Sequence, residues 1–143
     1  MPHPLGGGLT VPDLMTRGMA WLARMGRRHM AVPVVYERPA GEGRKRARRV
    51  EVMAILGRPE ATGEASVGPV RVDAEAIDFL IVAADLVFGN REVEPRSDDR
   101  VYLSRNGRTL VYEVMPRNSG NPPWHWSDPQ RTIRRISAKL IGN

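Results

Sequence analysis

The side chains best suited to acid–base or metal chemistry in this chain are its three histidines. His3, His29 and His125 stand far apart and lack the close, regular spacing of a metal-binding motif. His125 and Asp128 are near enough in sequence to form an acid–base pair, although a local hydrogen bond within one loop is the simpler interpretation. The histidines therefore predict neither a metal site nor a catalytic residue.

The adjacent carboxylates Asp98 and Asp99 are the other candidate site, since they precede a segment that alternates like a strand. They could bind a divalent cation, but solvated carboxylates in a turn are the simpler interpretation. The sequence has no glycine-rich phosphate loop followed by lysine, and no nucleophile motif. We therefore expect no enzyme activity, no metal and no cofactor.

Positive charge is concentrated in the first third of the chain. Ten Lys and Arg residues oppose three carboxylates between Asp13 and Arg49, a net charge of +7, whereas the whole chain carries +6. Such a basic segment suits a nucleic acid or an acidic protein surface, and it also suits ordinary solubility. Its densest part is a basic loop over residues 39–49 that contains Arg44, Lys45, Arg46, Arg48 and Arg49.

Two tryptophans form the second candidate surface. Trp124 and Trp126 flank His125, so in an extended loop both rings point to the same side. Such a pair could stack on nucleic-acid bases, at about 1–3 kcal/mol per base. Alternatively, one ring caps the end of a barrel and the other contacts a partner subunit, because tryptophan is enriched at interface hot spots.

The clearest structural signal is Asn106-Gly107, which lies between two segments of alternating apolar and polar residues. Both residues tolerate the positive φ of a tight hairpin turn. A two-residue turn pairs Arg105 with Arg108 and, further out, Arg100 with Glu113. This register predicts an antiparallel hairpin whose apolar face consists of Val101, Leu103, Leu110, Tyr112 and Val114.

The remaining segments predict a second hairpin, two segments that fit either a helix or a strand, and two connections. Val32 to Arg38 and Val50 to Leu56 predict a second hairpin, closed by the basic loop. Asp73 to Phe88 and Thr132 to Leu140 fit either a helix or a buried strand, since periodicity alone cannot separate the two. In the strand interpretation of the last segment, Arg135 faces outward. Two polar stretches predict connections: Arg58 to Gly68 and Gly89 to Asp99.

The first thirty residues predict an arm and a helix. Residues 1–9 predict a flexible arm, and residues 10–30 an amphipathic helix that begins at the capping signal Thr10-Val11-Pro12-Asp13. Its apolar stripe, bordered by Trp21, would cover the β domain of residues 31–143 or pack on a neighbouring subunit. No cysteine is present, no signal peptide is evident, and the longest apolar run is too short to cross a bilayer.

An ordered set of short motifs resembles a family of tailed-phage and prophage neck proteins, the head–tail joining, head-completion or stopper proteins. The similarity covers residues 10–142, and the extended Gly41–Arg49 segment departs from the family pattern. Its markers in order are Gly18 with Trp21-Leu22, Pro33-Val34-x-Tyr36, Asp78-Phe79-Leu80-Ile81 with Asp85-Leu86, Pro95, Asp99-Arg100-Val101, Gly107, Tyr112-Glu113-Val114, Trp124-x-Trp126-Ser127-Asp128 and Arg134-Arg135-Ile136.

The resemblance implies a mainly β fold: a small antiparallel β-barrel with an N-terminal amphipathic helix and long loops. It implies strands over Phe79 to Ala83 and Thr132 to Leu140. It also implies a homo-oligomeric ring in the virion neck, assembled in the host cytoplasm without a membrane, that joins the portal and its adaptor to the tail and, as a stopper, closes the DNA channel.

In such a ring the basic loop, with Arg44, Lys45, Arg46, Arg48 and Arg49, would contact packaged DNA through phosphates and without sequence preference. Trp21, Trp124, Trp126 and Arg135 would lie at subunit or partner interfaces. Three alternatives stay open: a tail-terminator or adaptor ring subunit, a monomeric barrel that binds nucleic acid without sequence preference, and a small metal-dependent enzyme using His125, Asp128 and Asp98.

Overall fold

A computed structural model describes residues 31–41, 43, 46–59, 75–118 and 120–142. The predicted arm and helix of residues 1–30, with Trp21, lie outside the described residues, as do Arg44, Lys45 and most of the predicted connection from Arg58 to Gly68.

The described chain is mainly β. Its elements are β1 (Ala31–Arg38), β2 (Arg48–Gly57), β3 (Ala76–Val82), the single 3₁₀ turn η1 (Ala83–Asp85), β4 (Val87–Phe88), β5 (Arg91–Glu92), β6 (Arg100–Arg105), β7 (Arg108–Val114), β8 (Trp124–Trp126) and β9 (Ile133–Gly142). The strands predicted for Phe79 to Ala83 and Thr132 to Leu140 are confirmed as β3 and β9, except that Ala83 begins the 3₁₀ turn.

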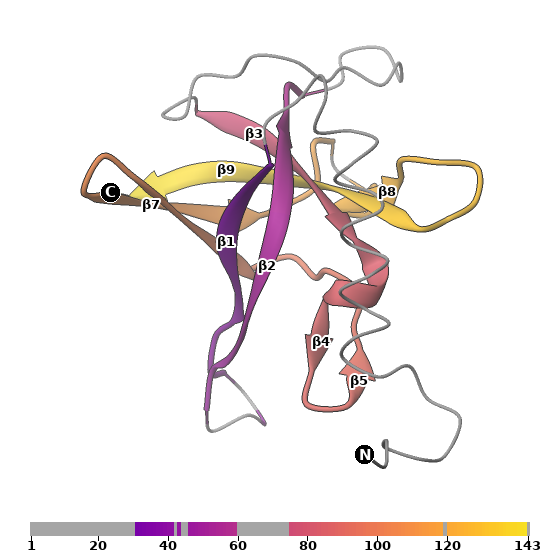
Figure 1. Ribbon diagram of the computed structural model, residues 1–143, viewed down its shortest axis with the longest axis horizontal. Coiled ribbons are helices and arrows are strands. Elements are labelled where there is room, and N and C mark those ends of the chain that lie inside the picture. The colour runs from indigo at the N-terminus through magenta and orange to yellow at the C-terminus, as the bar shows by residue number, and fades with distance from the viewer. Residues whose placement is uncertain (1–30, 42, 44–45, 60–74, 119, 143) are drawn as a thin grey trace, which may run out of the picture.

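Six antiparallel strands close into a barrel in the order β3-β2-β1-β6-β7-β9, and β9 returns to pair with β3. Figure 1 shows β1 and β2 crossing in front of β7 and β9, with the β1–β2 hairpin extending away from the barrel. The seven residue pairs between β3 and β9 make the closure. The predicted antiparallel β-barrel is therefore confirmed.

The β6–β7 hairpin has the predicted register, including Arg105 opposite Arg108 and Arg100 opposite Glu113. Asn106 and Gly107 have φ values of 51° and 77°, the left-handed conformation that a tight hairpin turn requires. The predicted apolar face is buried throughout. The turn residues and the alternation were sufficient to predict this hairpin, because each strand packs one face on the core and leaves the other face outside it.

The barrel interior holds the main core, because each strand buries every second residue there. Phe79 of β3 and Tyr112 of β7 meet edge to face with ring centroids 5.4 Å apart, although their strands are not neighbours. A second apolar cluster lies on the outward side of the wall, where Ile55, Leu80 and Ile133 come from β2, β3 and β9.

Three predicted boundaries are wrong. Arg48 and Arg49 belong to β2 and not to the basic loop, because they pair with Arg38 and Glu37 and extend the β1–β2 ladder. Residues 89–99 are not all loop, since Arg91–Glu92 forms β5 and pairs with β4. The tryptophan segment is also a strand: β8 pairs with β9, which supplies a ladder partner that the local sequence does not reveal.

Candidate functional site

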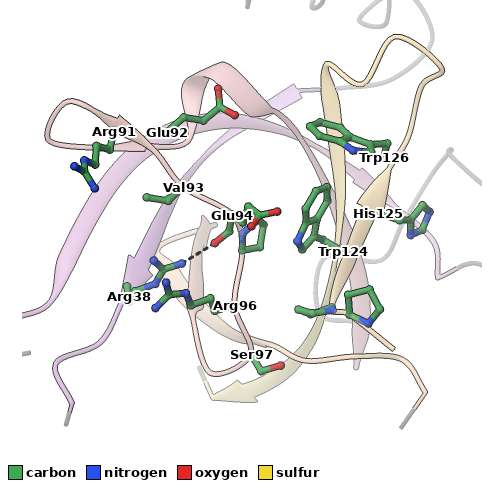
Figure 2. A pocket seen from close by; sticks show the side chains of 13 residues that line it. Arg38, Arg91, Glu92, Val93, Glu94, Arg96, Ser97, Trp124, His125 and Trp126 are labelled. Carbon is green, nitrogen blue, oxygen red and sulfur yellow. Dashed lines mark hydrogen bonds between the residues drawn. The ribbon is translucent and has the colours of Figure 1, made fainter. Parts of the chain in front are cut away.

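A groove of about 830 Å³ lies between β8 and the segment of residues 91–97. In Figure 2, Trp124 and Trp126 project from β8 toward that segment, and His125 points to the opposite side of the strand. This alternation is the ordinary period of a strand. The groove is lined by Arg38, Arg91, Glu92, Val93, Glu94, Pro95, Arg96, Ser97, Pro122, Pro123, Trp124, His125 and Trp126.

The two tryptophan rings are positioned by each other and by Arg134. Their centroids are 5.0 Å apart at an interplanar angle of 90°, so the prediction that both point to one side is confirmed. The Arg134 guanidinium lies 4.7 Å from the centre of the Trp124 ring and 5.1 Å from that of Trp126. A cation over two aromatic faces is attracted by both ring quadrupoles, and the contact is stronger when it is buried.

Arg134 also ties β9 to the opposite wall of the groove. It donates to the Val93 carbonyl at 2.6 Å and to the Glu92 carboxylate at 3.2 Å. Its side chain is buried, and this burial lowers the pKa of Arg134 against the opposing effect of Glu92. The guanidinium thus holds the tryptophans and the Glu92–Val93 backbone in fixed relative positions.

Arg38 anchors the lower part of the same wall. It donates to both Asp99 oxygens, at 3.0 and 2.9 Å, and to the Glu94 carbonyl at 2.8 Å, a contact drawn in Figure 2. Tyr36 donates to Asp99 at 2.5 Å, and burial, followed by Asp99, raises the pKa of Tyr36 so that it stays protonated. The Arg96 backbone N–H completes the shell around Asp99.

This network corrects the interpretation of Asp98 and Asp99 as two solvated carboxylates. Asp99 is 2% exposed and bonds to Arg38, Tyr36 and the Arg96 backbone, so it fastens the loop to β1. Asp98 is exposed and adopts a left-handed φ of 78°. Among the residues that the structure describes, no group of three or more His, Cys, Asp or Glu side chains could hold a metal ion.

Arg135 lies on the opposite side of β9, on the outward face of the barrel wall as predicted, but it is fully buried there. It donates to Asp78 at 2.8 Å and to the Arg58 carbonyl at 2.5 Å. Arg117 also pairs with Asp78. The buried carboxylate explains the burial of Arg135, since a guanidinium is seldom buried without a partner. Its contacts inside the subunit leave no exposed surface of Arg135 for a partner.

The described part of the basic segment divides into two kinds of arginine. Arg46 and Arg48 are exposed near the end of the β1–β2 hairpin. Arg49 instead donates to the buried Glu37 carboxylate at 2.6 Å, and its guanidinium lies 5.9 Å from the centre of the Tyr102 ring. Tyr102 donates to the same carboxylate at 2.8 Å. Arg49 therefore makes structural contacts with the barrel wall.

Asp128 organises the turn between β8 and β9. Its carboxylate accepts hydrogen bonds from the backbone N–H groups of Thr132 and Ile133 and from the Thr132 hydroxyl. Partial burial opposes ionisation, but these hydrogen bonds outweigh it and lower the pKa of Asp128. Asp128 therefore forms local hydrogen bonds within one loop, as the sequence suggested, and they hold the backbone of the β8–β9 turn.

Comparison with known proteins gives one family. A family model described as phage head-tail joining protein matches residues 12–143. The chain belongs to the phage head-tail joining protein family. No curated protein and no solved structure matches it. The head-tail joining family is structural rather than enzymatic, and it places the chain in the neck of a phage particle. Among the described residues, no helix has the length and hydrophobicity needed to span a bilayer.

The structure brings together some predicted site residues of this head-tail joining protein and separates others. Trp124 and Trp126 share one groove, whereas Arg46 and Arg48 lie on a different hairpin. Sequence reasoning missed Arg134 and Arg38, which build the groove. Trp126 lies opposite Arg134 in the β8–β9 ladder, so Arg134 could have been predicted if the tryptophan segment had been recognised as a strand.

Proposed function

We propose that this protein is a subunit of a homo-oligomeric ring in the phage neck, which joins the portal-bearing head to the tail. The head-tail joining family match over residues 12–143 carries this proposal. The closed barrel supports it, because a subunit gripped by copies of itself must keep its shape under load from both sides. Stopper, adaptor and tail-terminator rings share this requirement.

The groove between β8 and residues 91–97 is the surface that we assign to a partner contact. Trp124 and Trp126 are half-buried, so their rings are held by the subunit and still reach its surface. Aromatic residues that are fixed before binding lose little conformational entropy when a partner covers them. This supports the predicted interface role of both tryptophans.

We assign contact with packaged DNA to Arg46 and Arg48. Both are exposed near the end of a hairpin that extends from the barrel (Figure 1), and neither contacts a carboxylate among the described residues. Repeated around a ring, such a hairpin would place positive charge at the wall of a channel. The contact would be with phosphates, so it would weaken with salt and show no sequence preference.

The joining role is tested by complementation in vitro. DNA-filled heads lacking this protein are mixed with tails, with or without the purified chain, and joined particles are counted by electron microscopy and by infectivity. We expect joined particles only when the chain is added, with a ring of density between head and tail. If heads and tails join equally well without it, the chain has no joining role.

The DNA contact is tested separately with Arg46→Ser/Arg48→Ser. The slope of log affinity for duplex DNA against log salt should become shallower by about 0.9 for each phosphate that the variant no longer neutralises. Arg108→Ser/Arg131→Ser removes the same charge from exposed positions outside the β1–β2 hairpin and serves as the control. Equal slopes for the two double variants would remove the β1–β2 hairpin from the DNA contact.

A further inference from the structure

The outer edge of β8 offers main-chain hydrogen-bonding groups that no described strand uses. β8 ends the strand order and pairs only with β9 among the described strands. The Ser137 N–H donates to the Pro123 carbonyl, and the Ser127 N–H to the Ile133 carbonyl, both at 2.8 Å. Bonded and non-bonded pairs alternate in an antiparallel ladder, so Trp124 and Trp126 are the non-bonded positions. Their N–H and C=O groups therefore point away from β9.

The groove runs along this edge. Side chains of consecutive strand residues point to opposite faces, yet all three residues of β8, Trp124, His125 and Trp126, line the groove. Only a space that follows the strand edge can contact both faces. Its far wall is the segment of residues 91–97, as Figure 2 shows. The groove thus has a strand edge on one side and a second stretch of backbone on the other.

Both walls are held in place before anything binds. Arg134 joins the tryptophan rings to Glu92 and Val93, and Arg38 holds the Glu94 carbonyl. A preformed site does not lose ordering entropy of its own when a ligand enters. An extended ligand therefore meets a fixed edge.

The charges around the groove favour an acidic ligand. Glu92 is paired with Arg134, and Arg38 with Asp99. Arg91 and Arg96 are exposed, and no carboxylate of the described residues pairs with either. Glu94 is the single carboxylate of the groove whose side chain has no described partner. The unpaired side chains thus sum to one positive charge, which favours an acidic segment over a basic one.

We propose that the outer edge of β8 is a strand-addition site, which binds an extended acidic segment of a neighbouring protein beside Trp124 and Trp126. Main-chain hydrogen bonds supply the binding, and Arg91 and Arg96 select for negative charge. β8 has three residues, so the added strand forms at most the bonds of two residues on the β8 side, which suits a contact made in many copies. That the segment comes from a head or tail protein rests on the proposed neck function; the strand addition itself does not.

The test uses a short, blocked peptide of alternating valine and glutamate, added to the full chain. Amide hydrogen exchange is followed by NMR for three neighbouring residues. We expect exchange at Trp124 and Trp126 to slow at least tenfold at saturation, with little change at His125, whose N–H faces β9. The same peptide N-methylated at every residue cannot donate from either of its edges and should bind at least tenfold more weakly.

Charge selection is tested with Arg91→Glu/Arg96→Glu. This variant should bind the acidic peptide at least tenfold more weakly and should bind a valine–lysine peptide better than the natural chain does. Arg108→Glu/Arg131→Glu, which changes charge by the same amount outside the groove, should leave both affinities unchanged. Binding that ignores N-methylation, or that leaves the exchange at Trp124 and Trp126 unchanged, would overturn the strand-addition site.

The two proposals fail in different ways. A chain that supports head–tail joining but shows no edge protection with the peptide overturns strand addition and leaves the neck function intact. A chain that shows the protection but does not support joining overturns the neck function and leaves the strand-addition site intact.

Discussion

Arg134 and Arg135 are consecutive residues of β9 and both are buried, but they contact different partners on opposite faces of the strand. Arg135 points to the side of the sheet that carries Asp78, and its guanidinium is enclosed with that carboxylate. Arg134 points to the groove, where its partners are two half-buried tryptophan rings and the exposed Glu92. Consecutive strand residues point to opposite faces, so Arg135 forms a structural ion pair on one face and Arg134 contributes to a surface site on the other.

The difference teaches that burial alone does not separate a structural charge from a functional one. What separates them is the exposure of the partners. The carboxylate paired with Arg135 is 3% exposed, whereas that paired with Arg134 is 49% exposed. Breaking the first pair leaves a charge stranded in the interior, and breaking the second leaves a carboxylate that water can solvate.

The largest effect is expected from Asp78→Ala. It leaves Arg135 buried without its carboxylate, and we expect a loss of about 3–5 kcal/mol in the free energy of unfolding, measured by urea denaturation. Glu51→Ala removes an exposed carboxylate from β2 and is the control, with a change within about 0.5 kcal/mol. If the two variants lose equal stability, the Asp78 pair is not the structural element that the burial indicates.

Arg134→Met is expected to cost less, about 2 kcal/mol, because methionine keeps the packing on the tryptophan rings while the charged hydrogen bonds to Val93 and Glu92 are removed. Tryptophan fluorescence should shift as the rings of Trp124 and Trp126 lose the guanidinium. Arg91→Met, at an exposed position of the same groove, should change neither signal appreciably. A loss as large as that of Asp78→Ala would erase the contrast between the two arginines.

The smallest effect is expected at the turn that joins β8 to the arginine pair. The pKa of Asp128 is lowered in the folded state, so its contribution to stability is present above its ordinary value of 3.8 and is lost as pH falls through the lower folded value. Asp128→Asn should cost about 1 kcal/mol or less at neutral pH, with the difference from the natural chain shrinking in acid.

The Asp128 comparison is made by thermal unfolding at several pH values. A difference that grows as pH falls below 3.8 would contradict the assigned hydrogen bonds. In Asp128→Asn, amide exchange at Ser127, whose N–H donates to the Ile133 carbonyl, should quicken more than exchange at Leu80, which lies on the Arg135 side of the barrel.

How much the sequence predicts depends on whether the determining contacts are local. The β6–β7 hairpin was predicted residue by residue, because Asn106-Gly107 fixes its turn and alternation fixes its face. The resemblance predicted the barrel and assigned β3 and β9 as strands, where periodicity alone left a helix open. Arg48 and Arg49 were placed in a loop because composition marks a loop, whereas the ladder with β1 depends on pairing across the hairpin.

The site could be predicted only in part, for the same reason. The parallel direction of Trp124 and Trp126 follows from their spacing and is confirmed. The outward orientation of Arg135 was predicted from alternation, but its burial was not, because Asp78, 57 residues away, supplies the partner that makes burial favourable. Arg38 and Asp99 are separated by 61 residues, and neither local sequence indicates that the two side chains pair.

The pairing of β3 with β9 has a mechanical consequence. An open sheet under tension can be peeled from its free end, one hydrogen bond after another. Here the six-strand ladder is continuous, so a pull on any strand is shared with both of its neighbours. A subunit built in this way would resist stretching as a hoop does.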